Sequence, residues 1–423
     1  MKQKTITIIL TIIAVFVPML IVPTKIFTGT YSYLLKNIIM LSGGLLLLIF
    51  MLVNYKKLEI DFKDALAILF MSLVFVSTCL SENKDNSILG EKTRCEGMLM
   101  FASYICVYIA SKKFFKYKNN KMFLNIMFYS SMIIGVLGIA QNYMSFNKLY
   151  PIFGKNIAGT FGNSNFFGSY ISIILPISIT IFILNADKKS FILSLVMFFD
   201  LISSGTRSAW VAFLVVAFLG FIYLIKQKNK LYWKRTGILL ICFIAICVYL
   251  FSGISKSITK RKYNSVINDI KTFSEEGLSD NLGSGRMEIW KMTIKLIGKN
   301  PIFGCGTDNL RHGLMKDCQD EFLKFAYRTK TIPDKAHNEY LHIAATLGIP
   351  ALIIYLMFVG MILFPKMKDM FKYKTMLIIS ITIISYLVQA FFNISTIGVA
   401  PLFWMILGLS DNEDFVNKIK EKI

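Results

Sequence analysis

Long apolar stretches recur along the whole chain, and their length limits what the chain can fold into. A helix needs about 20 apolar residues to cross about 30 Å of hydrocarbon, and the stretches run to about that length. Inside a bilayer every backbone N–H and C=O must be paired within the protein, so a spanning segment is a helix or a strand of a closed barrel. Strand-length alternation of apolar and polar residues is absent. The sequence therefore predicts an all-α polytopic membrane protein.

About twelve transmembrane helices are expected, in a single integral membrane domain over residues 1–423. The composition agrees with this, because 55% hydrophobic and 17% charged residues, with a mean hydropathy of +0.58, are too apolar for a soluble domain of 423 residues. The predicted spans are centred near residues 14, 42, 72, 104, 132, 176, 196, 216, 244, 352, 385 and 403.

Lysine and arginine are distributed unevenly between the segments on the two sides of these spans. If the N-terminus is cytoplasmic, the inside segments carry roughly three times as many basic residues as the short outer loops and adjoining helix ends. This bias predicts a multi-pass protein of the cell (plasma or inner) membrane with both termini in the cytoplasm. The net charge of +22 is therefore mostly a topology signal, and no nucleic-acid partner is expected.

The longest polar segment, residues 255–336, lies between the ninth and tenth spans and is predicted to be a large extracytoplasmic loop. All three histidines of the chain lie in it or directly after it. Cys305 and Cys318 also lie in it, and could form a disulfide in an oxidising compartment. If the chain carries out chemistry, this segment is where we expect it.

One stretch of this loop, Arg286 to Lys299, has the pattern of a short amphipathic helix. Its lysines recur every four residues on one face, and its apolar residues recur at helical spacing on another. The apolar set is Met287, Trp290, Ile294 and Ile297. Such a helix either lies on the membrane surface, with its lysines toward lipid or phosphate, or packs on the spans with a solvated lysine face.

A glycine- and asparagine-rich stretch, Gly154 to Gly168, precedes the sixth span. It cannot continue a helix in lipid, so it is predicted to form a structured re-entrant or interfacial turn. Asn163 or Asn165 would cap the helix that follows, and the free N–H groups of that helix start could meet an anion. An ordinary helix start with a flexible turn is the alternative.

The turn between the seventh and eighth spans carries Arg207 at the outer membrane edge. An arginine there is also explained as a residue that reaches the interface. Asp200 lies about two helical turns back in an apolar span, where an unpaired carboxylate is costly. It is therefore expected to pair with Arg207 or Lys36.

The outer segment ends at His337-Asn338-Glu339-Tyr340, shortly before His342. The two histidines are five residues apart, about 140° around a helix, unlike the i, i+4 pair of a zinc-binding H-E-x-x-H. No metal site is predicted. A histidine before a helix is often structural, but this one closes the segment that carries Arg286, so a catalytic role competes with that interpretation.

Four motifs of this chain resemble the O-antigen ligase and polymerase family, in matching order from about residue 150 to 365. They read G-T-F-G-N-S-N-F-F-G-S-Y before a span, S-S-G-T-R-S-A-W at a hairpin, G-S-G-R-M-E-I-W with N-P-I-F-G-C-G-T-D-N-L in the outer loop, and A-H-N-E-Y-L-H-I-A-A-T-L-G-I-P after it. In two respects the chain departs from the family pattern: Thr206 stands where the family more often has serine, and Asp200 is not part of it.

The resemblance implies a membrane glycosyltransferase with a GT-C-like fold. Members move a glycan from undecaprenyl pyrophosphate to a hydroxyl on a glycan, lipid or protein acceptor at the outer face of the membrane. On matching positions it assigns Arg207 and Arg286 to the donor pyrophosphate and His337 to the acceptor. Asn163, Asn165, Asp200 and Asn338 are expected to support them, beside contacts with membrane lipids.

The residues fit this chemistry independently of the resemblance. Guanidinium groups can stabilise a pyrophosphate leaving group without a metal, and histidine is a base suited to a hydroxyl acceptor. Direct displacement would invert the anomeric centre, and no cofactor is expected. The alternative is a polytopic carrier or lipid-glycan flippase, to which the polar span residues Asp200, Gln389 and Asn393 would also be suited.

Overall fold

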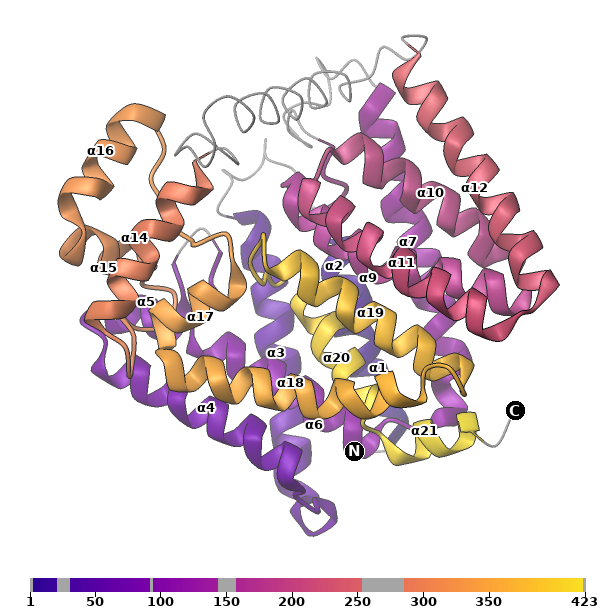
Figure 1. Cartoon of the computed structure of the whole chain (residues 1–423). Coiled ribbons are helices and arrows are strands. Elements are labelled where there is room, and N and C mark those ends of the chain that lie inside the picture. The colour runs from indigo at the N-terminus through magenta and orange to yellow at the C-terminus, as the bar shows by residue number, and fades with distance from the viewer. Residues whose placement is uncertain (1–2, 21–30, 92–93, 144–156, 253–284, 421–423) are drawn as a thin grey trace.

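In a computed structural model, residues 3–20, 31–91, 94–143, 157–252 and 285–420 are described, and every regular element in these ranges is helical (Figure 1). The predicted all-α fold class is thus confirmed. The outer segment before Gly285 and the start of the Gly154–Gly168 stretch lie outside the described residues.

The helices fall into three consecutive groups along the chain. The N-terminal group comprises α1 (Gln3–Thr11), η1 (Ile12–Phe16), α2 (Val17–Met19), α3 (Tyr31–Val53), η2 (Tyr55–Lys57), α4 (Phe62–Leu80), α5 (Lys84–Leu89), α6 (Met98–Phe114), η3 (Tyr117–Asn119) and α7 (Asn120–Tyr143). The central group comprises α9 (Ser164–Asn185), α10 (Lys188–Ser204), α11 (Arg207–Gln227) and α12 (Lys230–Phe251). The C-terminal group comprises α14 (Arg286–Lys299), α15 (Leu310–Asp317), α16 (Gln319–Thr329), α17 (Glu339–Leu347), α18 (Ile349–Asp369), α19 (Lys374–Ala390), α20 (Ala400–Ser410) and α21 (Glu413–Lys420).

Seven helices of the described residues are long and apolar enough to cross a membrane: α3, α4, α7, α9, α11, α12 and α18. Shorter apolar helices lie at Thr5–Met19, Lys374–Ala390 and Ala400–Ser410. A helix is present at each of the twelve predicted centres. The number of twelve spans stays a prediction, because several of these helices are shorter than a bilayer normally requires.

Helix α9 is the centre of the helical bundle. Of its most apolar window 83% is buried, compared with 17% for α12 at the periphery. It packs against α10, α11, α12 and α19. The first turn of this helix therefore has a fixed position, which matters because several candidate site residues lie there.

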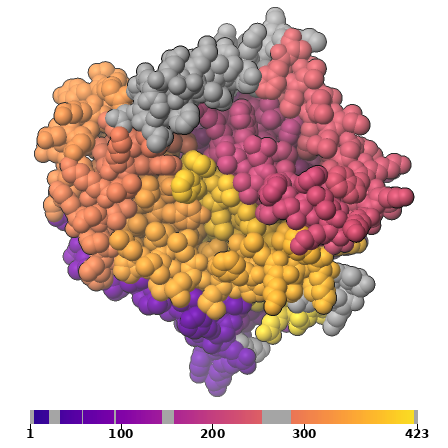
Figure 2. Space-filling view, in the orientation of Figure 1, coloured from indigo at the N-terminus to yellow at the C-terminus, as the bar shows by residue number. Residues whose placement is uncertain are grey.

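Helices α14 to α17 form a lobe with a hydrophobic core of its own, shown in orange at one side of Figure 1. Figure 2 shows the lobe in contact with the N-terminal helices in purple and the C-terminal helices in yellow. Its core includes Ile289, Met292, Leu296, Phe322 and Phe325. Cys305 and Cys318 are both free thiols, so the disulfide that the sequence left open is not formed.

The predicted helix Arg286–Lys299 is confirmed with the same bounds as α14, but its buried face is different. Ile294 is exposed, and the lobe core takes Ile289, Met292 and Leu296 instead. Lys295 pairs with Glu321 at 2.5 Å. The lysine face therefore pairs at least partly with α16 and does not serve lipid alone, so α14 is a packed helix of the lobe.

The turn between α14 and α15 fastens the lobe to the bundle. Asn309 donates through its amide nitrogen to the Ser81 hydroxyl at 2.6 Å, to Asn83 O at 2.9 Å and to the Ser87 hydroxyl at 2.8 Å. Within the lobe, the backbone N–H of Gly306 donates to Thr346 O of α17 at 3.0 Å. The N-P-I-F-G-C-G-T-D-N stretch thus has a structural role here.

Asp308, in the same turn, joins the lobe to the loop between α5 and α6. One carboxylate oxygen accepts from the backbone N–H of Glu91 at 2.7 Å and of Glu96 at 3.2 Å. The other pairs with buried Lys335, two residues before His337. A single side chain therefore positions two separate loops.

Candidate functional site

The start of α9 lies directly against the start of α11. The Thr206 hydroxyl, immediately before α11, donates to Ser164 O at 2.8 Å. Asn163 caps α9 by accepting from the N–H of Asn165 at 2.8 Å. The prediction that one of these two asparagines caps the helix is thus confirmed for Asn163. Arg207, the first residue of α11, is thereby fixed beside the N-terminus of α9.

The loop after α19 connects the start of α9 to the start of α14. Asn393 donates to Asn165 O at 3.0 Å and to the Ser169 hydroxyl at 2.9 Å. The preceding residue, Phe392, accepts from Nη1 of Arg286 at 2.8 Å. These contacts bring Arg286 from the lobe to the α9 end that also holds Arg207.

The start of α17 joins the same group through Trp290 on α14. The indole Nε1 donates to Ala336 O at 2.9 Å, and Asn338 caps α17 by accepting from the N–H of Leu341 at 3.0 Å. His337 lies between these two fixed points. Four helices, α9, α11, α14 and α17, thus begin around one site.

Arg207 and Arg286 are close enough for their charges to interact. Burial lowers the pKa of the Arg286 guanidinium, and the charge of Arg207 lowers that pKa further. Two cations at the positive ends of helices repel one another unless an anion lies between them. Helix N-termini and guanidinium groups both bind phosphate oxygens well. The arrangement is suited to an anion that has several oxygen atoms.

Arg94 adds a third guanidinium to this site, and the sequence analysis did not select it. It pairs with Asp334 at 3.1 Å and lies over the Phe166 ring at 5.4 Å. Its Nη1 is buried and has no hydrogen-bond partner among the described residues. In the sequence Arg94 counted only as one basic residue of an outer loop, and no motif marked it.

His337 has a backbone conformation that is unusual for its residue type. Its φ of +50° lies in the left-handed region, which costs a non-glycine residue about 1–3 kcal/mol, and unlike Ala186, Lys228 and Lys330 it is not the C-cap of a helix. Its Nδ1 is buried without a hydrogen-bond partner among the described residues. The Trp290 and Asn338 hydrogen bonds on either side hold this conformation.

Burial, together with the positive charges around it, keeps the imidazole of His337 neutral. Burial lowers the pKa of His337 to about 3, and Arg286, Arg94 and Lys335 contribute to that shift. A neutral imidazole can accept a proton. The pKa should rise once an anion offsets the guanidinium charges, because those charges would then oppose protonation less strongly.

Glu339 and His342 follow His337 in the chain and have surroundings of their own. Glu339 accepts hydrogen bonds from Tyr355 at 2.9 Å and Tyr386 at 3.1 Å, and burial raises its pKa to about 7. His342 lines a separate cavity of about 30 Å³, together with Glu96 and Lys335. Glu339 therefore anchors the start of α17 to α18 and α19.

Asp200 does not take the place that the sequence suggested. Neither carboxylate oxygen has a hydrogen-bond partner among the described residues, so the expected pairing with Arg207 or Lys36 is not found. Lys36 donates instead to Thr160 O at 3.2 Å. The Asp200 carboxylate lies against Gly138 of α7, because α10 presents it sideways to a neighbouring helix. The other predicted residues gather around the four helix starts.

Substituting Gly168 tests how closely α9 and α11 must approach. A Cβ there would lie 2.8 Å from the Thr206 Cβ and 3.1 Å from its hydroxyl oxygen. We expect Gly168→Ala to lower the free energy of unfolding by about 1–3 kcal/mol through overpacking. Gly220→Ala on α11 is the matched control, because a Cβ there meets nothing within 4 Å. Thermal unfolding of both variants in detergent measures the difference, and equal midpoints would contradict the expectation.

Comparison with known proteins gives two findings. A family model described as O-antigen ligase matches residues 192–356, a range that includes Arg207, Arg286 and His337. A curated protein of Haemophilus influenzae, described as uncharacterized, is 24% identical over 380 residues, which cover 87% of this chain and 87% of that protein.

Proposed function

We propose that this chain, whose residues 192–356 match a family model described as O-antigen ligase, transfers a glycan from an undecaprenyl-pyrophosphate donor to a hydroxyl acceptor. The family supports glycan transfer of the ligase or polymerase type. The observation that carries the proposal further is the convergence of Arg207, Arg286 and His337 on one set of helix starts.

The donor pyrophosphate binds among Arg207, Arg286 and Arg94. Its negative charge increases as the glycosidic bond to phosphate breaks, so fixed cations stabilise the transition state more than the ground state. Two observations support an anion at this position: Nη1 of Arg94 has no hydrogen-bond partner within the described ranges, and Arg207 and Arg286 repel each other. The N-termini of α9 and α11 add partial positive charge.

His337 acts on the acceptor. Its neutral imidazole takes the proton of the acceptor hydroxyl while the acceptor oxygen attacks the anomeric carbon. The bond between that carbon and the phosphate oxygen breaks, and its electron pair leaves with undecaprenyl pyrophosphate. Attack from the face opposite the leaving group inverts the anomeric centre.

The reaction takes place at the extracytoplasmic face of the cell membrane, with both termini in the cytoplasm. The positive-inside bias supports this orientation. So does the position of the arginines at the α9 start, since the opposite end of the bundle carries clustered basic residues such as Lys189 and Lys230. Glycan, lipid and protein acceptors all offer the required hydroxyl.

The carrier alternative drew on Asp200, Gln389 and Asn393. Asn393 bonds to Asn165 O and to Ser169, so a structural role accounts for its burial. No observation at the other two residues favours transport over transfer.

Transfer by the purified protein tests the proposal. The protein in detergent is given a synthetic undecaprenyl-pyrophosphate glycan and a glycan acceptor, in the presence of EDTA. We expect an inverted glycosidic linkage and release of undecaprenyl pyrophosphate, because guanidinium groups carry the leaving-group charge. Activity lost in EDTA and restored by a divalent ion would contradict the role given to the arginines.

Arg207→Lys should lose most of the transfer activity although the positive charge is retained. A single ammonium cannot present the planar pair of donors with which a guanidinium binds two phosphate oxygens. Arg235→Lys is the matched control, because Arg235 lies on α12 and donates to Ile183 O and Leu184 O. Initial rates at equal protein amounts measure the effect. Near-normal transfer by Arg207→Lys would reduce Arg207 to an interfacial residue.

A further inference from the structure

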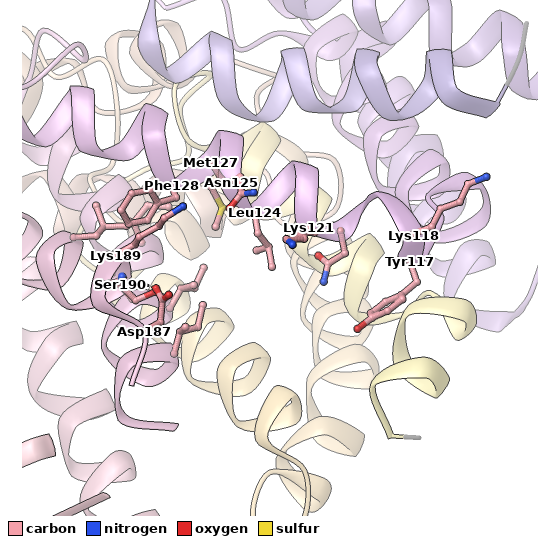
Figure 3. A pocket seen from close by; sticks show the side chains of 16 residues that line it. Tyr117, Lys118, Lys121, Leu124, Asn125, Met127, Phe128, Asp187, Lys189 and Ser190 are labelled. Atoms are coloured by element: carbon pink, nitrogen blue, oxygen red, sulfur yellow. Dashed lines mark hydrogen bonds between the residues drawn. The ribbon is translucent and has the colours of Figure 1, made fainter. Parts of the chain in front are cut away.

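A hollow of about 590 Å³ lies between α7, α9 and α10, at the helix ends opposite the arginines (Figure 3). Figure 3 shows Lys121 and Leu124 of α7 on one side of it, and Asp187, Lys189 and Ser190 on the other. The glycan-transfer site uses the start of α9, whereas this hollow uses its C-terminal half. The two sites therefore do not overlap.

The wall of the hollow changes from basic at its mouth to apolar inside. Lys118, Lys121 and Lys189 line the mouth and are exposed. Further along the helices the lining is Met127, Ile174, Ile177 and other apolar side chains. Met127 lies six residues beyond Lys121, about 9 Å along the helix axis. This combination matches a ligand with a charged head and a hydrocarbon body.

Among the described residues, no carboxylate pairs with the lysines at this mouth. The only acidic lining residue is Asp187, whose carboxylate accepts from the N–H and the hydroxyl of Ser190, both at 2.7 Å. Lys189 donates to the Tyr129 hydroxyl at 3.1 Å. Among the described residues, neither Lys118 nor Lys121 has a carboxylate partner.

A second group of lysines, Lys112 and Lys113, differs from those of the hollow because it is paired with carboxylates. Lys112 is paired with Asp61 at 2.5 Å, Asp64 at 2.8 Å and Asp411 at 2.7 Å. Lys113 is paired with Asp64 at 2.7 Å. Lys112 and Lys113 are thus neutralised by carboxylates, whereas no carboxylate of the described residues pairs with the lysines of the hollow.

We propose that this hollow binds one anionic phospholipid of the adjacent leaflet. Its phosphate lies between Lys121 and Lys189, with Asn125 near the ester region, and one acyl chain follows the apolar wall toward Met127 and Ile177. Basic hollows between helices at a membrane surface are suited to such headgroups. The site does not depend on the glycan-transfer proposal, since it shares no residue with it.

A free anion would leave the apolar wall unused, and a neutral lipid would leave the lysines unneutralised. Both alternatives can be separated from the proposal by experiment. The protein is placed in nanodiscs of phosphatidylcholine alone or with phosphatidylglycerol, and bound lipid is counted by native mass spectrometry after release. We expect one phosphatidylglycerol to be retained by the unmodified protein.

Two variants and a control decide the matter. Each lysine near an anionic headgroup contributes to the free energy of lipid binding. The double variant Lys121→Gln, Lys189→Gln should therefore weaken phosphatidylglycerol binding by about thirtyfold. The double variant Lys230→Gln, Lys234→Gln removes the same charge from exposed positions of α12 and should leave phosphatidylglycerol binding unchanged. Leu124→Trp fills the hollow, keeps the lysines, and should displace the lipid.

Several results would overturn the proposal. Equal retention of phosphatidylglycerol by the two lysine pairs would show that binding follows overall charge. Equal retention of phosphatidylcholine and phosphatidylglycerol would show that charge has no role. If inorganic phosphate still protected Leu124→Trp against thermal unfolding, with no lipid retained, the hollow would be assigned to a free anion. Unchanged melting temperatures verify that the variants are folded.

Discussion

His337→Ala should lower the turnover of glycan transfer by about 10²–10⁴, the usual contribution of a general base, while donor binding is kept. Binding is kept because the arginines that contact the pyrophosphate remain in place. His337→Asn should lose as much, although asparagine tolerates the left-handed backbone that His337 adopts. Single-turnover rates and donor titrations measure the two quantities separately.

The control for this prediction is His312→Ala. His312 is on α15, where its ring nitrogen contacts the side-chain amides of Asn83 and Asn86 at 3.0 and 3.3 Å, away from the arginines. It should keep full turnover. An active His337→Ala would remove the base from the proposed mechanism. If His337→Ala lost turnover and His337→Asn kept it, the effect would be due to the backbone conformation and not to the imidazole.

The same histidine predicts a particular pH dependence. Its pKa is about 3, lowered by burial first and then by the charges of Arg286, Arg94 and Lys335. The value of kcat/KM, which reports the free enzyme, should therefore show no loss from imidazole protonation between about pH 8 and pH 5. Bound donor offsets the guanidinium charges and raises the pKa of His337, so kcat should fall with acid at a higher pH than kcat/KM.

Arg286→Ala should weaken donor binding by about 10- to 100-fold, the range for hydrogen bonds to charged groups, and should lower turnover as well. Arg286 is partly buried beside Arg207, so its charge is less screened than that of a surface arginine. Donor affinity is measured by titration with a fluorescent undecaprenyl-pyrophosphate glycan.

Arg235→Ala is the control for the loss of an arginine that also bonds to backbone carbonyls. Its Nη1 donates to Ile183 O at 2.6 Å, much as Arg286 donates to Phe392 O at 2.8 Å. Donor affinity should not change in this variant. A normal affinity in Arg286→Ala would instead mean that this arginine only fastens the lobe to the loop after α19.

Local patterns predicted the helices and the N-cap but not how the faces pack. The helical spacing of apolar residues in α14 is visible in its own sequence, and the bounds of the helix were predicted correctly. Its buried face depends on Phe322 and Phe325 of α16, and so the lobe core takes Ile289, Met292 and Leu296 while Ile294 is exposed. Helical spacing shows that a face exists, whereas the partner selects which face is buried.

The candidate site shows the same limit. Arg207, Arg286 and His337 stood in motifs, so sequence reasoning could select them and the structure brings their helix starts together. Arg94 stood in no motif, and its place follows from contacts with Asp334 and Phe166 that only the folded chain makes. The partner proposed for Asp200 failed for a related reason, because distance along a helix does not determine which neighbour a side chain meets.

The position of Asp308 bears on how a protein of this kind can evolve. Its carboxylate holds the backbone on both sides of Arg94, through Glu91 and Glu96, and it also pairs with Lys335, two residues before His337. A substitution at Asp308 should therefore disturb the loop of Arg94 and the loop of His337 at once, and one compensating change in either loop should not restore both. We therefore expect the effects of substitutions at these positions to depend on one another, unlike those on the exposed surfaces of α15 and α16.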